Sequence, residues 1–404
     1  MKLRAILLCL TIGGVLMAAP PGWAQDKAKQ ELREMQQRLR VLQREFRVRM
    51  DGIERRLERL EGGKARRSPV RIKPGSPMGA SFGTVCPEGC AHISLSRAIR
   101  AARPGDTITV APGRAAMCAT VNKPLRIIGL MDSSGGRAHL AGRACAGKAA
   151  LIIQARNVVI EGFEISNIRV RDRNGACFRI EAGAADLTIR DVYCHDSENG
   201  ILGGPNFGTT TILDSVFERN GAGRGQAHGI YITKGDGLVL RNTRIISGKG
   251  QGHTLKSGAR RTLVEDSVLA ALDGQNSRAI DFFGGGELIV RRSVIQQGRN
   301  SDNHEFFGIA LEKGRRNPTP HKTVLEDNWI IYDDPARCCR WLFVARTLGP
   351  FIVKGNRFVG LTGVHEPSIA ARVRKDNRFY TNRRAAGLPR YDGTLGSLPK
   401  PGGL

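Results

Sequence analysis

Aromatic residues, acidic charge and long apolar runs are all scarce in this chain. Aromatic side chains make up only 5% of the 404 residues, while the 50 glycines favour a turn-rich repeat over an ordinary packed α/β enzyme. The 37 acidic residues face 63 lysines and arginines, which leaves a formal net charge of +26 at pH 7. Such a charge attracts polyanions, namely acidic polysaccharide, nucleic acid or an anionic membrane surface.

No apolar run beyond the first residues is long enough to span a membrane. At the start, Lys2 and Arg4 precede an apolar run over 5–19, and small residues lead to Ala24. This pattern predicts a signal peptide, 1–24, that is cleaved to give a periplasmic or secreted protein. A membrane anchor is the alternative, but the run is shorter than the roughly 20 residues that spanning requires. Export argues against nucleic acid and leaves acidic polysaccharide as the expected partner.

Cysteines are few and lack the C-x-x-C pairs or histidine partners of a zinc site. Eight remain after the signal peptide, an even number that favours disulfides in an oxidising compartment. Adjacent Cys338 and Cys339 are expected to bond elsewhere or stay free. The connectivity stays open at this stage, and the plausible neighbours are Cys86 with Cys90, Cys118 with Cys145, and Cys177 with Cys194.

Residues 26–61 carry a heptad pattern, with charged residues outside the apolar seam. This predicts a coiled-coil helix through which the chain forms a homo-oligomer. A single amphipathic helix lying on a membrane surface is the alternative. Arg49 and Gly52 interrupt the seam, so it does not choose between dimer and trimer. Residues 62–81 are basic and rich in Gly, Pro and Ser, which is typical of a flexible linker.

A strand followed by a turn residue then recurs along the chain, and the turn residues lie 23 to 35 positions apart. Each turn is followed by a second short apolar strand, with no helical pattern between them. This arrangement predicts a solenoid of β-strands. A leucine-rich repeat is the rival fold, but its leucine framework is missing. The repeated segments are RIIG (126–129), VIEG (159–162), TIRD (188–191), TILD (211–214), VLRN (239–242), LVED (263–266), IVRR (289–292), VLED (324–327) and IVKG (352–355).

Residues 92–113 combine a short amphipathic helix, a Gly105-Asp106 turn and a strand at Thr107–Val110. This combination resembles the start of the pectate-lyase-like right-handed parallel β-helix superfamily. The resemblance implies an all-β, right-handed parallel β-helix with an N-terminal capping helix over 82–360. Residues 361–404 are expected to form an irregular tail that packs back on the last coil. The superfamily includes pectate and alginate lyases, uronan epimerases, polygalacturonase-type hydrolases, phage tailspikes and proteins without known activity, so fold does not select a function.

Three similar segments, HGIYIT (228–233), HTLKSG (253–258) and RAIDFFG (278–284), start 25 residues apart. Neighbouring coils of a β-helix lie about 4.8 Å apart, so stacking predicts two rows of polar side chains. One row is Tyr231, Lys256 and Asp281, continued by Ala310, and the other is His228, His253 and Arg278. Alternation along the strands places Ile230, Leu255, Ile280 and Ile309 inside.

These rows contain the groups that β-elimination on a polyuronate requires. Arg278 or Arg260 can neutralise the sugar carboxylate. Lys256 or His253 can act as the base, because a lysine beside other cations has a lowered pKa. Tyr231 or His228 can act as the acid, and C5-epimerisation needs nearly the same set. Further substrate-binding candidates lie in flanking segments, namely His195 and Asn199 on one side and His304, Glu305 and Glu312 on the other.

Other activities fit the residues less well. Hydrolysis by two carboxylates has only Asp281 in the rows, although Glu305 or Glu312 can supply a second. A calcium site needs clustered carboxylates, and Asp302, Glu305 and Glu312 can contribute to one, although their spacing is not specific. Calcium therefore stays possible without a specific motif, and no other metal or cofactor is expected. The chain lacks the D-P-H-D motif of mannuronan epimerases. The remaining histidines, His92, His139, His321 and His365, have no comparable neighbours in the sequence.

The sequence therefore supports two classes of function. The first is a polyuronate lyase or C5-epimerase. The second is a non-catalytic glycan-binding or envelope-scaffold protein that oligomerises through its coiled coil and gains avidity from several copies. A tailspike or adhesin fits the coiled coil but not the signal peptide.

Overall fold

The computed structural model describes residues 84–205, 208–312, 317–333, 341–346, 349–364 and 367–402. They belong to the second of two compact units, Pro69–Leu404. The expected signal peptide, coiled coil and linker lie outside these residues, as do Cys338, Cys339 and His365. Within the described part, no helix is long and apolar enough to cross a membrane.

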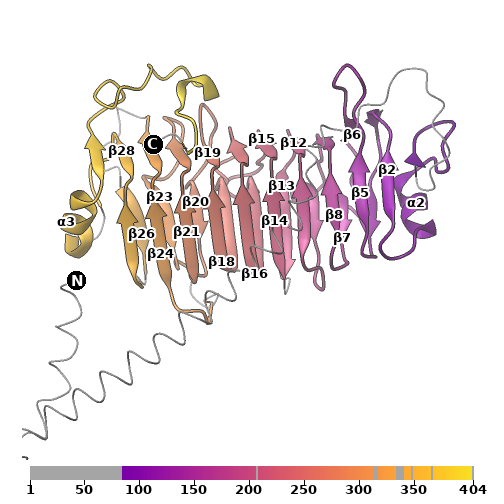
Figure 1. The fold of residues 1–404 in the computed structure, drawn as a ribbon, viewed down its shortest axis with the longest axis horizontal. Coiled ribbons are helices and arrows are strands. Elements are labelled where there is room, and N and C mark those ends of the chain that lie inside the picture. Colours follow the sequence, from indigo (N-terminus) through magenta and orange to yellow (C-terminus); the bar gives the residue numbers. More distant parts are fainter. Residues whose placement is uncertain are drawn as a thin grey trace, which may run out of the picture. The chain divides into compact units, whose positions relative to one another are not determined.

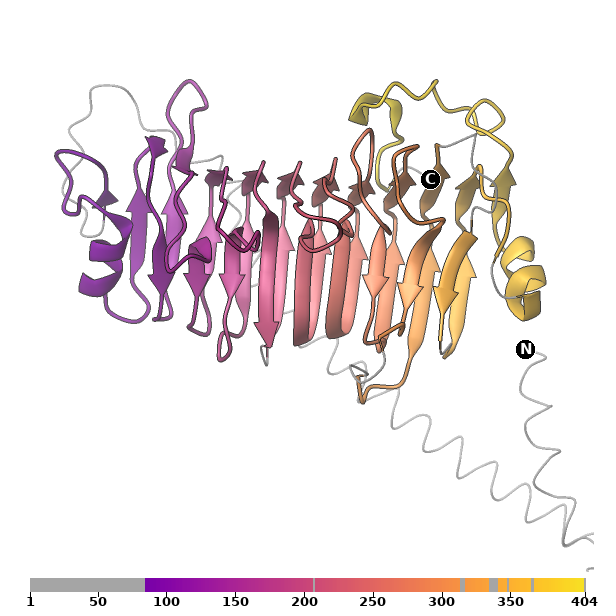
Figure 2. The same ribbon diagram turned by 180° about the vertical axis from the view of Figure 1, so that it is seen from behind.

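The described strands wind around one core as a parallel β-helix (Figures 1 and 2). The larger sheet contains β1 (Thr84–Val85), β2 (Thr107–Val110), β4 (Ala119–Val121), β5 (Arg126–Gly129), β7 (Ala149–Ile153), β8 (Val159–Glu161), β10 (Ala176–Ile180), β11 (Leu187–Arg190), β13 (Asn199–Pro205), β14 (Thr209–Leu213), β16 (Ile230–Arg241), β18 (Leu255–Glu265), β20 (Ile280–Phe282), β21 (Glu287–Arg291), β23 (Glu305–Ile309), β24 (Lys322–Glu326), β26 (Trp341–Ala345) and β27 (Phe351–Lys354). The smaller sheet contains β3 (Gly113–Ala115), β6 (Ala138–Ala141), β9 (Phe163–Ser166), β12 (Tyr193–His195), β15 (Val216–Glu218), β17 (Arg244–Ile246), β19 (Val268–Ala270), β22 (Val294–Gln297), β25 (Trp329–Tyr332), β28 (Arg357–Val359) and β29 (Arg378–Tyr380).

The larger sheet consists of two rows of strands. β16 and β18 join these rows into one sheet, because each is long enough to run through both. β16 spans 12 residues and β18 spans 11. Their first halves pair with each other and with β13 and β20, and their second halves pair with β14 and β21. The all-β parallel solenoid expected from the repeat is therefore confirmed.

Each repeated segment ends in a residue that turns the chain toward the smaller sheet. From Gly162 onward, all of these turn residues have positive φ, as at Asp214 (52°) and Asn242 (45°). Gly, Asn and Asp adopt this left-handed backbone conformation at low cost, which explains their recurrence in the sequence. Arg292 is the one residue among these turns that is not Gly, Asn or Asp, and its φ is 49°. It forms ion pairs with Glu265 and Asp266 on the preceding coil.

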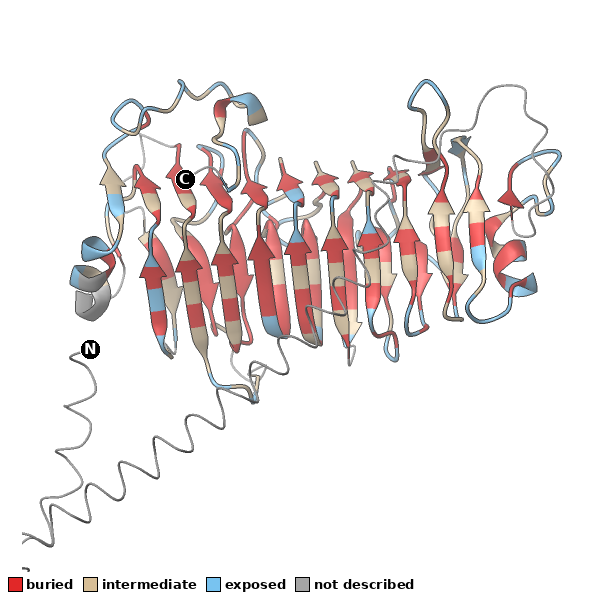
Figure 3. Cartoon of the chain, in the orientation of Figure 1, coloured by how far each residue is buried: buried red, intermediate tan, exposed pale blue. Residues whose placement is uncertain are grey.

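Buried residues recur on the strands of successive coils (Figure 3), and their side chains fill the interior. Burial of these aliphatic residues is the main stabilising contribution available to the solenoid. One continuous buried row is Ile108, Ile127, Ile160, Ile189, Ile212, Leu240, Val264, Val290, Leu325 and Val353.

Both ends of the described solenoid have a helix (Figure 1). At the N-terminal end, α2 (Leu95–Ala101) begins after the N-cap Ser94 and packs against β1, β2 and β4. At the other end, α3 (Pro367–Lys375) precedes β29, which adds a further strand to the smaller sheet. The segment after residue 361 is thus not irregular throughout.

The C-terminal tail packs back over several coils rather than over the last one alone. Its short helix η1 (Leu395–Ser397) and neighbouring apolar residues cover part of the smaller sheet. Arg383 forms a buried ion pair with Asp333, and the Gly402 N–H donates to the Arg292 carbonyl oxygen. The tail therefore shields apolar side chains that the smaller sheet would otherwise expose.

Three disulfides join the cysteine pairs that were plausible neighbours in the sequence. The bonds are Cys86–Cys90, Cys118–Cys145 and Cys177–Cys194.

Candidate functional site

The strand register brings the predicted polar row together. Tyr231 pairs with Lys256 across β16 and β18, and Lys256 pairs with Asp281 across β18 and β20. The next coil differs from the prediction. Asp281 pairs with Gly308 rather than Ala310, because Phe307 takes the interior position beside Ile280.

The placement of Ala310 in the polar row was therefore wrong. Ala310 is fully buried, and its N–H donates to the Phe282 carbonyl oxygen. A shift of two residues leaves the inward and outward alternation unchanged, so alternation alone could not detect it. The change matters for the site, because a Cβ at Gly308 would lie 2.9 Å from Asp281 Oδ1. Glycine here leaves room beside the carboxylate.

The second row forms a hydrogen-bonded ladder along the coils. The His253 N–H donates to His228 Nδ1 at 2.9 Å, and the Arg278 N–H donates to His253 Nδ1 at 3.2 Å. One coil earlier, Asn199 Oδ1 accepts the His228 N–H at 2.8 Å. The two imidazole rings stack with centroids 5.3 Å apart. Because each Nδ1 accepts a backbone proton, neutral imidazoles here carry their own proton on Nε2.

Both histidines are held in the neutral form. Burial, together with the charge of Lys256, lowers the pKa of His228 to about 3. Burial, with His228, Lys256 and Arg278 as further causes, lowers the pKa of His253 to about 2. A protonated ring would also need to break its bond from the backbone N–H. His253 therefore presents an N–H donor at Nε2, and this donor faces Asp281.

Asp281 is the most perturbed acid of the site. Its side chain is 6% exposed, and Oδ2 lies 3.2 Å from His253 Nε2 and 3.7 Å from Lys256 Nζ. Burial raises the pKa of Asp281 to about 6, Glu312 adds to the rise, and Lys256 and Arg278 oppose it. Oδ1 is buried and has no hydrogen-bond partner among the described residues. An unpaired buried carboxylate oxygen is costly and marks a position where a ligand group can bind.

Lys256 lies between aromatic rings and carboxylates. Its Nζ is 5.2 Å from the centroid of Tyr231 and 5.3 Å from that of Phe283, within cation–π range. The same Nζ lies 2.8 Å from Glu312 Oε1. Among the described residues, Asp281 and Glu312 are the carboxylates that contact Lys256 Nζ, whereas the sequence interpretation assumed neighbouring cations.

Arg278 completes the cluster from the second row. Its Nη2 lies 3.2 Å from Glu305 Oε2, and its Nε is buried without a hydrogen-bond partner among the described residues. Glu305 and Glu312 therefore reach the cluster as partners of its two cations. The site contains six predicted residues, namely His228, Tyr231, His253, Lys256, Arg278 and Asp281, and we refer to them as the stacked cluster.

Three further polar residues near the predicted site have other surroundings. Arg260 is half-exposed and forms an ion pair with Asp236. His304 has a buried Nδ1 without a partner among the described residues. Asp302 accepts a hydrogen bond of 3.4 Å from Gln251 and does not form a carboxylate cluster with Glu305 and Glu312.

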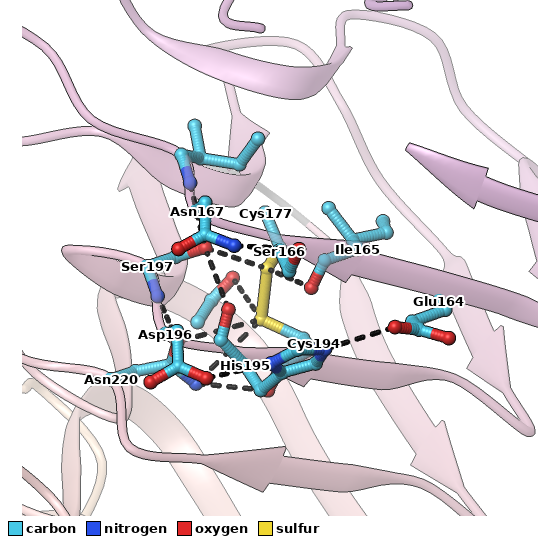
Figure 4. Close-up of a disulfide and its surroundings, with 12 residues drawn as sticks. Glu164, Ile165, Ser166, Asn167, Cys177, Cys194, His195, Asp196, Ser197 and Asn220 are labelled. Carbon is cyan, nitrogen blue, oxygen red and sulfur yellow. Dashed lines mark hydrogen bonds and ion pairs between the residues drawn. A yellow bond between two sulfur atoms is a disulfide. The ribbon is translucent and has the colours of Figure 1, made fainter. Parts of the chain in front are cut away.

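His195 lies on a different sheet from the stacked cluster. It belongs to β12 of the smaller sheet, and its Nε2 lies 3.1 Å from Glu164 Oε1 (Figure 4). His139 contacts the same oxygen, Glu164 Oε1, through Nδ1 at 3.3 Å. Sequence reasoning did not single out Glu164, although it follows His139 by 25 residues, the spacing that also separates His228 from His253.

Comparison with known proteins confirms the fold. The family model described as "Right handed beta helix region" matches residues 142–319. No curated protein matches the chain. The structure is similar to an alginate lyase from Paenibacillus sp. str. FPU-7, with 16% identity, coverage of 75% of this chain and 99% of that chain, and a TM-score of 0.49.

Two further solved structures are similar. A DFA-IIIase from Arthrobacter chlorophenolicus A6 has 14% identity, covers 69% of this chain and 88% of its own, and has a TM-score of 0.45. The pectate lyase Pel9A has 14% identity, 69% and 80% coverage, and a TM-score of 0.42. With TM-scores below 0.5, these similarities determine neither substrate nor reaction. The chain is a right-handed parallel β-helix whose chemistry rests on its own residues.

Proposed function

We propose that this right-handed parallel β-helix protein binds acidic polysaccharide and acts on it as a polyuronate lyase or C5-epimerase. The observation that carries the proposal is Asp281, a buried carboxylate with one unpaired oxygen, held beside Lys256 and His253. The net charge of +26 supports an anionic polymer as the ligand.

The contacts favour a revised division of roles. Asp281 acts as the base, because a carboxylate whose pKa is raised to about 6 is ionised near neutral pH and still accepts a proton readily. His253 is a positioning residue, since its Nε2 lies 3.2 Å from Asp281 Oδ2 and its Nδ1 accepts the Arg278 backbone N–H. Lys256 and Arg278 neutralise the sugar carboxylate. Tyr231 is the proton donor.

In elimination, Asp281 removes the C5 proton while the C4–O bond breaks. A C4=C5 double bond forms, and the leaving oxygen takes a proton from Tyr231. In epimerisation, C4–O stays intact and a proton returns to the opposite face of C5. Both reactions stabilise the same carbanion-like charge on the uronate, which requires cations near the carboxylate.

A non-catalytic glycan-binding protein remains the second candidate, and specific contacts favour it. Glu312 and Glu305 already neutralise Lys256 and Arg278 within the fold. The side chains of Lys256 and Arg278 are only 15% and 17% exposed. In this case the stacked cluster stabilises the solenoid, and basic residues elsewhere bind the polymer.

A substrate panel separates the two candidates. The protein is incubated with alginate, pectate and glucuronate-containing polymers, and unsaturated product is followed by ultraviolet absorbance. Epimerisation is followed by deuterium incorporation at C5. Turnover that Asp281→Asn abolishes supports the enzyme, while binding without turnover or C5 exchange on every polymer supports the scaffold.

A further inference from the structure

A second cluster of histidine and carboxylate groups lies on the smaller sheet. His139 on β6, Glu164 on β9 and His195 on β12 come from three successive coils. The ligand atoms of the three residues all lie within 4.8 Å of one another. Glu164 Oε1 lies 3.3 Å from His139 Nδ1 and 3.1 Å from His195 Nε2.

The hydrogen-bond partners of His195 leave one contact unexplained. Its Nδ1 lies 2.8 Å from Asp196 Oδ2, and its Nε2 lies 3.1 Å from Glu164 Oε1. Carboxylate oxygens accept protons and do not donate them when ionised, whereas a neutral imidazole has only one N–H. If that proton faces Asp196, two acceptor atoms face each other between His195 and Glu164. A cation bound between the two atoms removes this conflict, as does a second proton on the His195 ring.

The imidazole rings of His139 and His195 each have a second polar partner, which holds the ring so that its other nitrogen faces Glu164. Ser166 Oγ lies 2.8 Å from His139 Nε2, and Asp196 holds His195 Nδ1. Arg219 and Lys249 form ion pairs with Asp196 in turn. Metal-ligating histidines commonly have such partners on the second ring nitrogen, which set the tautomer and the ring orientation.

The backbone that carries His195 is also held firmly. Cys194, the preceding residue, points inward and forms the disulfide with Cys177 (Figure 4). His195 therefore faces the outer surface of the sheet from a strand that is covalently linked to β10. A ligand set on three paired strands, one of them cross-linked, is preorganised.

We propose that His139 Nδ1, Glu164 Oε1 and His195 Nε2 bind a divalent transition metal ion of the zinc class. Two imidazoles and one carboxylate are a ligand set that zinc accepts, with a fourth position left for water. In a tetrahedral site with bonds of about 2.0–2.1 Å, neighbouring ligand atoms lie about 3.3–3.4 Å apart. The two contacts of Glu164 match this spacing. The ion would join three coils through their side chains.

This site is independent of the stacked cluster, which lies on the other sheet and contains no residue of the triad. Failure to bind zinc would therefore leave the proposed enzymatic function untouched, and absence of turnover would leave the zinc site untouched. Its ligands were not expected from the sequence, because the third ligand follows Glu164 by 31 residues and not by the 25 that separate the first two.

Zinc titration of the tag-free, chelator-treated, full-length protein tests the site. Calorimetry is expected to show one zinc ion per chain, and Co²⁺ in its place is expected to give the visible absorption of a low-coordinate site. Glu164→Gln and His139→Asn should each weaken zinc binding at least about tenfold, and Asp196→Asn should weaken it about 10- to 100-fold. Zinc should also raise the midpoint of thermal unfolding of the wild-type chain.

Two controls keep the test decisive. His92→Asn changes a histidine outside the triad and should leave zinc binding unchanged, which excludes loss through general histidine removal. Circular dichroism of each variant shows whether it is folded. The proposal is overturned if the wild-type chain binds no stoichiometric zinc, or if a folded His139→Asn/His195→Asn double variant keeps the wild-type affinity.

Discussion

His253 Nε2 lies 3.2 Å from Asp281 Oδ2, and its other ring nitrogen accepts the backbone N–H of Arg278. The backbone bond therefore places the imidazole proton on the nitrogen that faces the carboxylate. Neither residue can change its protonation state without affecting the other. This relationship links a structural hydrogen bond of the solenoid to the proposed chemistry at Asp281.

The activity should depend on pH through Asp281. Its pKa is raised to about 6, so the basic form is populated above pH 6 and falls about tenfold per pH unit below it. We expect kcat/KM to rise with pH up to about 6 and then level off on this limb. Initial rates between pH 4 and 8 measure the profile, and a rate that is flat across pH 6 contradicts the assignment of Asp281 as the base.

The folded state should also bind a proton at Asp281 more tightly than the unfolded state does. Because the folded pKa is raised from 3.8 to about 6, the stabilising contribution of this group is present below about pH 4 and is lost as pH rises through 6. Asp281→Asn should therefore be more stable than the wild type above pH 6. Urea unfolding at pH 7.5 measures the difference, and Asp214→Asn, which makes the same change at an exposed turn, is the control.

Two replacements of His228 should show whether its Nδ1 acceptor stabilises the ladder. His228→Ala leaves the buried His253 N–H without an acceptor, which should cost about 1–3 kcal/mol of unfolding free energy. His228→Asn should change the unfolding free energy little at pH 7, because an asparagine oxygen can accept the His253 N–H. Asn199 Oδ1 already accepts the His228 N–H in this way one coil earlier. Chemical denaturation measures the unfolding free energy of both variants, and equal losses of this free energy would contradict the role of His228 in the ladder.

The stability of the wild type should depend more strongly on acid than that of His228→Asn. The lowered pKa of His228 means that the folded state resists protonation, so its stabilising contribution is present above about pH 6.5 and is lost as pH falls toward 3. Asparagine does not titrate in this range. His228→Asn should therefore lose less stability than the wild type between pH 6.5 and 4, as measured by thermal unfolding.

A methyl group at Gly308 should disturb the carboxylate without unfolding the protein. The added Cβ would lie 2.9 Å from Asp281 Oδ1 and 3.1 Å from Arg278 Cδ, both closer than usual contacts. We expect Gly308→Ala to lower kcat/KM at least about tenfold. Gly363→Ala is the matched control, since its nearest side-chain atoms lie 3.7 Å away. Equal activity of the two variants contradicts the proposed role of the space beside Asp281.

Removal of the Cys177–Cys194 disulfide should destabilise the solenoid. The bond closes a loop of 17 residues in sequence and links β10 to β12. The double variant Cys177→Ala/Cys194→Ala should lose about 2–4 kcal/mol of unfolding free energy, chiefly because the unfolded chain gains freedom. Guanidinium unfolding measures this loss. An unchanged midpoint would show that the neighbouring coils alone hold β12 in place.

The repeat and its turns could be predicted from the sequence because both depend on local chemistry. Gly, Asn and Asp mark positive-φ turns, and alternating apolar residues mark the interior, so the pairing of Tyr231, Lys256 and Asp281 followed from equal spacing. Where coil length changes, this reasoning fails. Ile280 pairs with Phe307 and not Ile309, because a two-residue shift preserves the alternation.

The electrostatic surroundings could not be predicted for a related reason. Glu305 lies on β23 and Glu312 in the loop after it, and nothing in the sequence shows that they reach Arg278 and Lys256. The His139–Glu164–His195 cluster depends in the same way on coils of unequal length. Long-range contacts between irregular segments determine both environments.

The central claim is that Asp281 takes the C5 proton of a uronate. The most direct measurement is incubation of wild-type, Asp281→Asn and Asp214→Asn proteins with polyuronates in deuterated water, with unsaturated product and C5 deuterium measured together. We expect product or exchange with wild type and Asp214→Asn, and a loss of at least about 100-fold with Asp281→Asn. Wild-type rates in a folded Asp281→Asn variant would contradict it.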